Sequence, residues 1–160
     1  MAATTEGEQA IVGLDPSDSI VFTVVEKTSP KSVLTISNPS EFQHVTFKVK
    51  TTRPLRYLVR PNQGVIGPKG TATVSVILQT KDCDEIVHMD SSERQKTNDK
   101  FLVQSAPVDD EFCNSIVDKS TKEITELLTQ KWNTFDKKDI INKKLRCAFT
   151  VGQVRDQTHI

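Results

Sequence analysis

The chain has 160 residues, with 21 basic and 21 acidic side chains and a hydrophobic content of 36%. That is enough for one core but lean for two, so we expect a single domain. The balanced charge argues against a nucleic-acid binder with a strongly basic surface. No stretch approaches the roughly 20 apolar residues that cross a bilayer, and the start has no secretory signal. The chain is therefore expected to be soluble and cytosolic.

The chain has three cysteines, Cys83, Cys113 and Cys147. Their spacing fits neither a disulfide framework nor a CxxC pair, which suits a reducing compartment.

The first predicted elements are short strands separated by turn residues. Residues 1–9 are small and polar and are expected to form a disordered tail. Residues 11–25 predict two strands, broken by a turn at Asp15-Pro16-Ser17. Further strands are predicted at residues 32–37, 45–50 and 57–60.

The middle of the chain is punctuated by proline and glycine. Pro61 is expected to rigidify a turn, where an X-Pro bond can be cis. The segment 61–70 lacks the spacing of a phosphate-binding loop and a following helix. It leads into a long strand in which Val74, Val76 and Leu78 share one face.

The last third predicts strands at residues 100–105 and 144–151. Residues 81–99 are charged and nearly patternless, which favours a long exposed loop. Apolar residues recur at helical spacing in 110–132, so one surface helix is expected before the final strand. Its charges are mixed, which favours packing on the domain over binding to an anionic membrane. Seven or so alternating strands with turns between them predict an all-β fold, an antiparallel β-sandwich.

A basic stretch runs from Phe42 to Lys81, with seven Lys or Arg and no Asp or Glu. Within it the letters FKVKTT alternate apolar and basic residues with the period of a strand. One face of this strand should enter the core, and the other should present Lys48 and Lys50. The asymmetry predicts an acidic partner.

Four collinear blocks carry a family resemblance: FKVKTT at 47–52, RYLVRPNQGVIGPKGTATVSVIL at 56–78, DKFLVQ at 99–104 and KKLRCAF at 143–149. Together they resemble the major sperm protein domain, and most closely the VAMP-associated proteins of the endoplasmic reticulum. The resemblance covers about residues 10–152 and leaves 153–160 as a C-terminal tail.

The resemblance implies an immunoglobulin-like, seven-stranded sandwich that binds acidic peptides carrying two phenylalanines (FFAT-type). Such peptides belong to lipid-transfer and other contact-site proteins. In this family the domain faces the cytosol from the endoplasmic reticulum and is followed by a coiled coil and a membrane anchor. Membrane attachment would come only through an anchor that these 160 residues do not include. The resemblance also allows a dimer in a full-length form.

The peptide-contact positions of the family fall on seven residues of this chain: Lys48, Lys50, Thr51, Thr52, Lys100, Leu102 and Lys144. Strand alternation supports this set, because it turns Lys100 and Leu102 outward together, and likewise Lys144 and Arg146. Leu102 departs from the methionine of close relatives, and its branched side chain is stiffer.

Three other interpretations are compatible with parts of the sequence. The lysines could form an ordinary solvated face, and the chain could be a cytoskeletal polymer subunit, like the nematode sperm proteins that share the fold. An enzyme is the least supported, because no local Ser/His/Asp or Cys/His motif is present. The histidines have no ligand spacing, so neither a metal nor a cofactor is expected; they are His44, His88 and His159.

Overall fold

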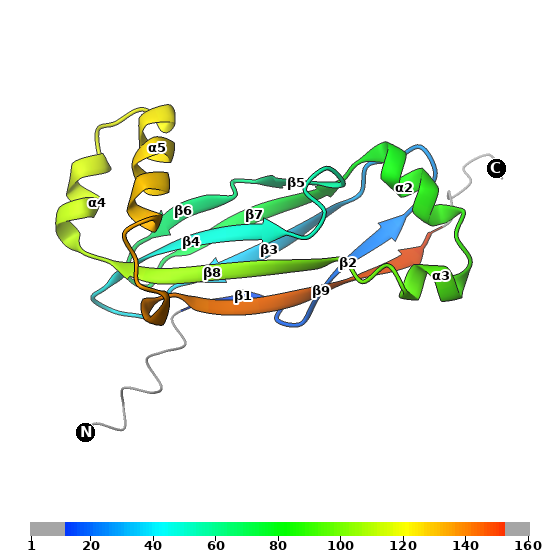
Figure 1. Ribbon diagram of the computed structural model, residues 1–160, viewed down its shortest axis with the longest axis horizontal. Coiled ribbons are helices and arrows are strands. Elements are labelled where there is room, and N and C mark those ends of the chain that lie inside the picture. Colours follow the sequence, from blue (N-terminus) through cyan, green and yellow to red (C-terminus); the bar gives the residue numbers. More distant parts are fainter. Residues whose placement is uncertain (1–11, 153–160) are drawn as a thin grey trace, which may run out of the picture.

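The computed structural model describes residues 12–152, which form two β-sheets packed face to face (Figure 1). The four-stranded sheet has the order β1 (Gly13–Asp15), β3 (Lys31–Ser37), β7 (Thr71–Leu78), β5 (Tyr57–Arg60). The five-stranded sheet has the order β2 (Ser19–Val24), β9 (Ile141–Val151), β8 (Lys100–Val108), β4 (His44–Thr51), β6 (Gln63–Ile66). The predicted tails at 1–9 and 153–160 lie outside the described residues.

The core lies between the sheets and is built from alternate side chains of their strands. As predicted for β7, Val74, Val76 and Leu78 are fully buried. Aromatic rings fill the space around Tyr57, whose ring centroid is 5.6 Å from that of Phe22 and 4.9 Å from that of Phe101. Because successive strand residues point to opposite faces, this inward set leaves the intervening side chains on the outer surfaces.

Two proline turns carry the chain from one sheet to the other. The turn at Asp15-Pro16 joins β1 to β2, and the turn at Arg60-Pro61 joins β5 to β6. Both X-Pro bonds are cis, so the expected turn at Pro61 is present. The short turn between β5 and β6 keeps these two strands on the same side of the sandwich, where each is the end strand of its own sheet.

The sandwich class is confirmed, but the strand details differ from the prediction. There are nine strands among the described residues rather than seven, and β2 pairs with β9 in parallel. Alternation within a strand fixes which side chains share a face. It does not determine the partner strand or its direction, which is why the parallel pair between the two ends of the domain was not foreseen.

The predicted loop at 81–99 is wrong. This segment forms α2 (Thr80–Val87) and α3 (Ser91–Gln95). Cys83 and Ile86, three positions apart on α2, are buried. Asp90 caps α3 through a reciprocal pair of hydrogen bonds with Glu93. The buried face of α2 is too narrow to show as a pattern among so many charges.

The single helix predicted at 110–132 is also corrected to two helices, α4 (Asp110–Ile116) and α5 (Thr121–Trp132). A second capping box explains the break, since the Ser120 hydroxyl accepts from the Glu123 N–H and the Glu123 carboxylate accepts from the Ser120 N–H. A 3₁₀ turn, η1 (Lys137–Asp139), precedes β9.

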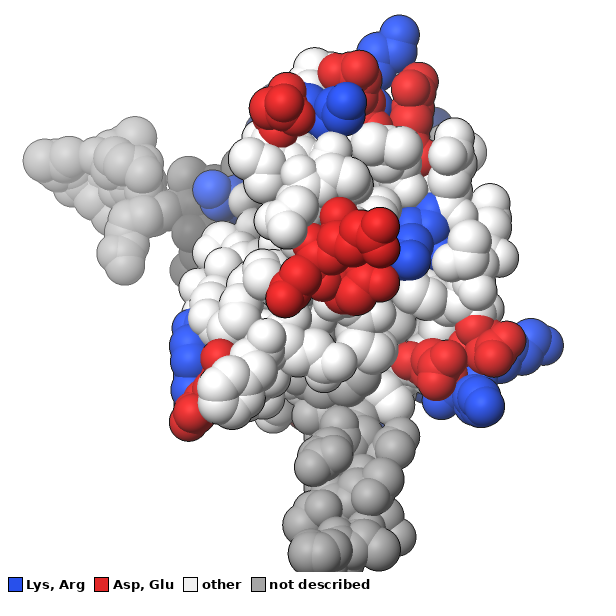
Figure 2. All heavy atoms as spheres, turned by 90° about the vertical axis from the view of Figure 1, so that its left-hand side faces the viewer, with Lys and Arg blue, Asp and Glu red and all other residues white. Residues whose placement is uncertain are grey.

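The helices sit at the two ends of the sandwich, α4 and α5 at one end and α2 and α3 at the other (Figure 1). Leu128 and Trp132 of α5 are buried against the domain, as expected for a packed helix. The end that carries α4 and α5 shows acidic and basic side chains interspersed among uncharged ones (Figure 2). Over residues 12–152, no helix has both the length and the hydrophobicity needed to span a membrane.

Candidate functional site

The predicted site residues lie on the outer face of the five-stranded sheet, where β8 runs between β4 and β9. Leu102 of β8 is paired with Lys50 on one side and with Lys144 on the other. Phe101 and Val103, its neighbours in the strand, are buried. The alternation predicted from the sequence is therefore confirmed, and it places a half-buried leucine between two exposed lysines.

A pocket of about 310 Å³ is centred on this position. We call it the Leu102 pocket; it is lined by Lys50, Thr51, Thr52, Lys100, Phe101, Leu102 and Lys144. Six of the seven predicted site residues are thus brought together. Its lining contains three ammonium groups and no carboxylate, so it attracts negative charge while its floor is apolar.

The two threonines close the end of the strand pair. The Thr52 hydroxyl accepts a hydrogen bond from the Lys100 N–H at 3.0 Å, and the Thr52 N–H donates to the Lys100 carbonyl at 3.1 Å. The Thr51 hydroxyl accepts from the Arg53 N–H at 3.1 Å. Both hydroxyls are therefore already used as acceptors, and Thr52 positions Lys100 at the rim of the pocket.

Lys48 is the predicted residue that does not line the Leu102 pocket. It lies on the same outer face, two positions before Lys50, but its Nζ sits 5.7 Å from the centroid of the Trp132 ring on α5. Partial burial lowers the pKa of the Lys48 ammonium, and the charge of Lys50 lowers it further. The Lys48 ammonium therefore contacts α5 and is not part of the lining of the Leu102 pocket.

Arg146 adds a further positive charge beside the pocket. It is exposed on β9 and is paired with Lys100 across the β8–β9 ladder. Its parity with Lys144 was visible in the sequence, although its position beside Lys100 was not. The basic face therefore comprises Lys50, Lys100, Lys144 and Arg146.

A buried ionic network beneath this face had no signal in the sequence. Asp99, immediately before β8, accepts hydrogen bonds from Arg56 Nη1 at 2.8 Å and from the Tyr57 hydroxyl at 2.6 Å. Arg56 also contacts Asp82 of α2, with Nε 3.4 Å from Oδ1. The network ties the loop after β4 and the helix α2 to Asp99, the residue that precedes the central strand β8.

Tyr57 and Cys147 are held neutral in this network. Burial raises the pKa of the Tyr57 phenol, with additional contributions from Cys147 and Asp99. Burial also raises the pKa of the Cys147 thiol to about 12, and its Sγ lies 3.3 Å from the Tyr57 oxygen. Cys147 is half-buried, and Leu145, two positions before it in β9, is fully buried.

Comparison with known proteins identifies the family. The model of the MSP (major sperm protein) domain matches residues 11–126. The human vesicle-associated membrane protein-associated protein B/C is 31% identical over 153 residues, which cover 94% of this chain and 53% of that protein. The human protein A of the same name is 33% identical over 157 residues, 97% of this chain and 53% of that protein. The chain thus spans about half the length of these relatives.

Solved structures give the same fold. WR4, an MSP family member of C. elegans, is 19% identical with a TM-score of 0.53, covering 86% of this chain and 98% of that one. The chaperone YadV is 7% identical with a TM-score of 0.52, covering 91% of this chain and 54% of that one. With the family model matching most of the described residues, the chain belongs to the major sperm protein domain family and has the VAMP-associated proteins among its relatives.

Proposed function

We propose that this domain is a non-enzymatic adaptor that binds acidic peptides containing two phenylalanines. Through them it holds lipid-transfer and other contact-site proteins at the cytosolic face of the endoplasmic reticulum membrane. The observation that carries the proposal is the position of Leu102, a half-buried apolar side chain paired with Lys50 and Lys144 in a pocket without carboxylates.

The pocket and the lysines have different parts in binding. One phenylalanine ring that buries about 150 Å² of apolar area contributes roughly 3 to 4 kcal/mol before ordering costs. Each exposed ion pair to Lys50, Lys100 or Lys144 contributes about 0 to 1 kcal/mol. The ring therefore supplies most of the affinity, and the lysines accelerate encounter with the acidic flank. The Thr51 hydroxyl hydrogen is placed to donate to a peptide carbonyl or to an acidic or phosphorylated side chain.

The test is a calorimetric titration with a synthetic acidic peptide that contains two phenylalanines. The double variant Lys100→Asp/Leu102→Asp places two carboxylates in the lining of the Leu102 pocket. We expect the affinity to fall by about 100-fold or more, because ring burial is lost and the acidic flank is repelled.

A matched control exists on the opposite sheet. Lys31 and Val33 are exposed and have the same spacing on β3, so Lys31→Asp with Val33→Asp makes the same chemical change away from the site. This control should bind like the wild type. Equal affinity of the two double variants, or a folded wild type that does not bind the peptide, would refute the proposed site.

A further inference from the structure

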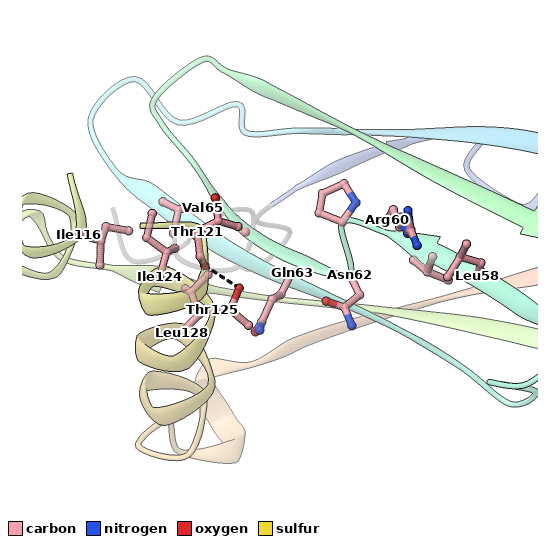
Figure 3. A pocket seen from close by; sticks show the side chains of 13 residues that line it. Leu58, Arg60, Asn62, Gln63, Val65, Ile116, Thr121, Ile124, Thr125 and Leu128 are labelled. Atoms are coloured by element: carbon pink, nitrogen blue, oxygen red, sulfur yellow. Dashed lines mark hydrogen bonds between the residues drawn. The ribbon is translucent and has the colours of Figure 1, made fainter. Parts of the chain in front are cut away.

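A second and larger pocket lies at the open side of the sandwich, between the end strands β5 and β6 and the helix α5 (Figure 3). Its volume is about 540 Å³, within the range of ligand-binding pockets. We call it the edge pocket. Val65 of β6 and Ile124 and Leu128 of α5 point toward it from opposite walls (Figure 3). The Val65 and Ile124 side chains are half-buried here, whereas Leu128 is almost fully buried.

The backbone of β6 offers free hydrogen-bonding groups along this pocket. The Val49 N–H donates to the Asn62 carbonyl at 2.8 Å, so the pair Val49–Asn62 is hydrogen-bonded across the β4–β6 ladder. In an antiparallel ladder such pairs alternate. Gly64 and Ile66 therefore direct their backbone groups to β4, whereas Gln63 and Val65 direct theirs to the open side. Since β6 is the last strand of its sheet, these groups meet no further strand among the described residues.

The edge pocket is continuous with the Leu102 pocket. A third pocket of about 440 Å³ lies between them and shares Lys50 and Thr51 with the Leu102 pocket. It shares Leu58, Val59 and Asn62 with the edge pocket. All three linings together contain no Asp or Glu, and Arg60 adds a positive charge at the edge. The whole path thus favours an acidic chain over a basic one.

We propose that the edge pocket is a second subsite for the same peptide ligand, whose chain continues from the Leu102 pocket and pairs with β6 as an added strand. The proposal rests on the proposed function. Free strand edges are bound in this way by extended peptides, with backbone hydrogen bonds for affinity and alternate side chains for specificity. One apolar side chain of the added strand would enter the space between Val65 and Ile124.

The strand geometry sets the length of ligand that is needed. From β8 to a strand added beyond β6 are three strand spacings, about 14 Å. The step along β4 from Lys50 to Thr46, which is paired with Val65, adds about 13 Å. At about 3.3 Å per residue, roughly six to eight residues separate the ring in the Leu102 pocket from the apolar residue beside Val65.

The test compares three kinds of synthetic peptide: the short acidic two-phenylalanine core, the core extended at either end by a segment with valines at alternate positions, and the core extended by a glycine-serine segment of the same length. In wild type we expect one of the valine extensions to bind about tenfold tighter than the short core. The glycine-serine extension should give no such gain. Equal affinity of the valine and glycine-serine peptides, at both ends, would overturn the proposal.

The matched variants are Val65→Pro and Val65→Ala. Proline removes the free N–H, which no ladder bond of β4–β6 uses, and edge strands tolerate it; alanine shortens the side chain and keeps the N–H. The short core should bind both variants like wild type, which also shows that both are folded. The valine extension should keep most of its affinity gain with Val65→Ala, which loses only part of one pocket wall, and should lose the gain with Val65→Pro. A gain retained by Val65→Pro would exclude strand pairing.

A second variant examines the helical wall. Ile124→Asp places a carboxylate in the edge pocket and should abolish the gain, whereas Val117→Asp, at a residue that is 76% exposed outside the pocket, should not. An unchanged gain with Ile124→Asp would contradict the subsite. Failure of the short core to bind folded wild type would refute the proposed function itself, an outcome distinct from the failure of the extension alone.

Discussion

At the scale of single residues, the buried Asp99 decides how the binding face is held. Its carboxylate is 3% exposed and satisfies the guanidinium of Arg56, which is itself almost fully buried. Removing one partner of such a pair leaves a charge without compensation in a low-dielectric site. Lys100 follows Asp99 directly, so the network fixes the beginning of the strand that carries the apolar floor of the Leu102 pocket.

We predict that Asp99→Asn lowers the free energy of unfolding by about 3 kcal/mol, because the Arg56 charge loses its closest acceptor. Urea denaturation measures this directly. Asp118→Asn, at an exposed carboxylate after α4, serves as the control and should change stability by less than about 0.5 kcal/mol. Equal midpoints for the two variants would show that the network contributes nothing to stability.

At the scale of elements, most strands were predictable, whereas the short strand β6 and the helices α2 and α3 were not. The strand β8 was predicted because Phe101 and Val103 alternate with polar neighbours over several residues. Helices α2 and α3 bury only two side chains between them, Cys83 and Ile86, too few for a periodic signal. The one strong local signal for the break between α4 and α5 was Ser120 followed by Glu123 three positions later.

We predict that Ser120→Ala destabilises the domain by about 1 kcal/mol, since the first turn of α5 loses the acceptor for the Glu123 N–H. The change in unfolding midpoint measures it. Ser120→Asp, which restores a capping oxygen, should return most of the stability. The short peptide core should bind both variants like wild type, because α5 does not line the Leu102 pocket. A destabilisation that aspartate does not reverse would argue against capping as the cause.

At the scale of the whole molecule, a net charge of zero conceals a separation of charge. The face formed by Lys50, Lys100, Lys144 and Arg146 is basic, whereas the end that carries α4 and α5 is mixed in sign (Figure 2). Local charge of this kind acts on the approach of a ligand within about a Debye length. This local charge contributes less to the stability of the complex once the aromatic ring is buried in the Leu102 pocket.

We predict that raising the salt concentration from about 50 mM to about 500 mM slows peptide association by roughly tenfold and changes the dissociation rate by less than about twofold. Stopped-flow kinetics separates the two rates. A peptide in which glutamine and asparagine replace the acidic residues should associate slowly at both salt concentrations. If salt chiefly raised the dissociation rate, the lysines would stabilise the bound complex rather than accelerate association.

The sequence by itself determined which side chains leave the core, because a strand turns successive residues to opposite faces whatever its neighbours are. That was enough to predict a sandwich, an outward Leu102 and outward lysines on three separate strands. Only the tertiary structure decided that β8 lies between β4 and β9, so that Lys50 and Lys144 flank Leu102, while Trp132 on α5 holds Lys48 apart. The buried Asp99 network and the free edge of β6 were likewise decided there. Strand order and packing depend on contacts between residues far apart in the chain, and local alternation carries no information about them.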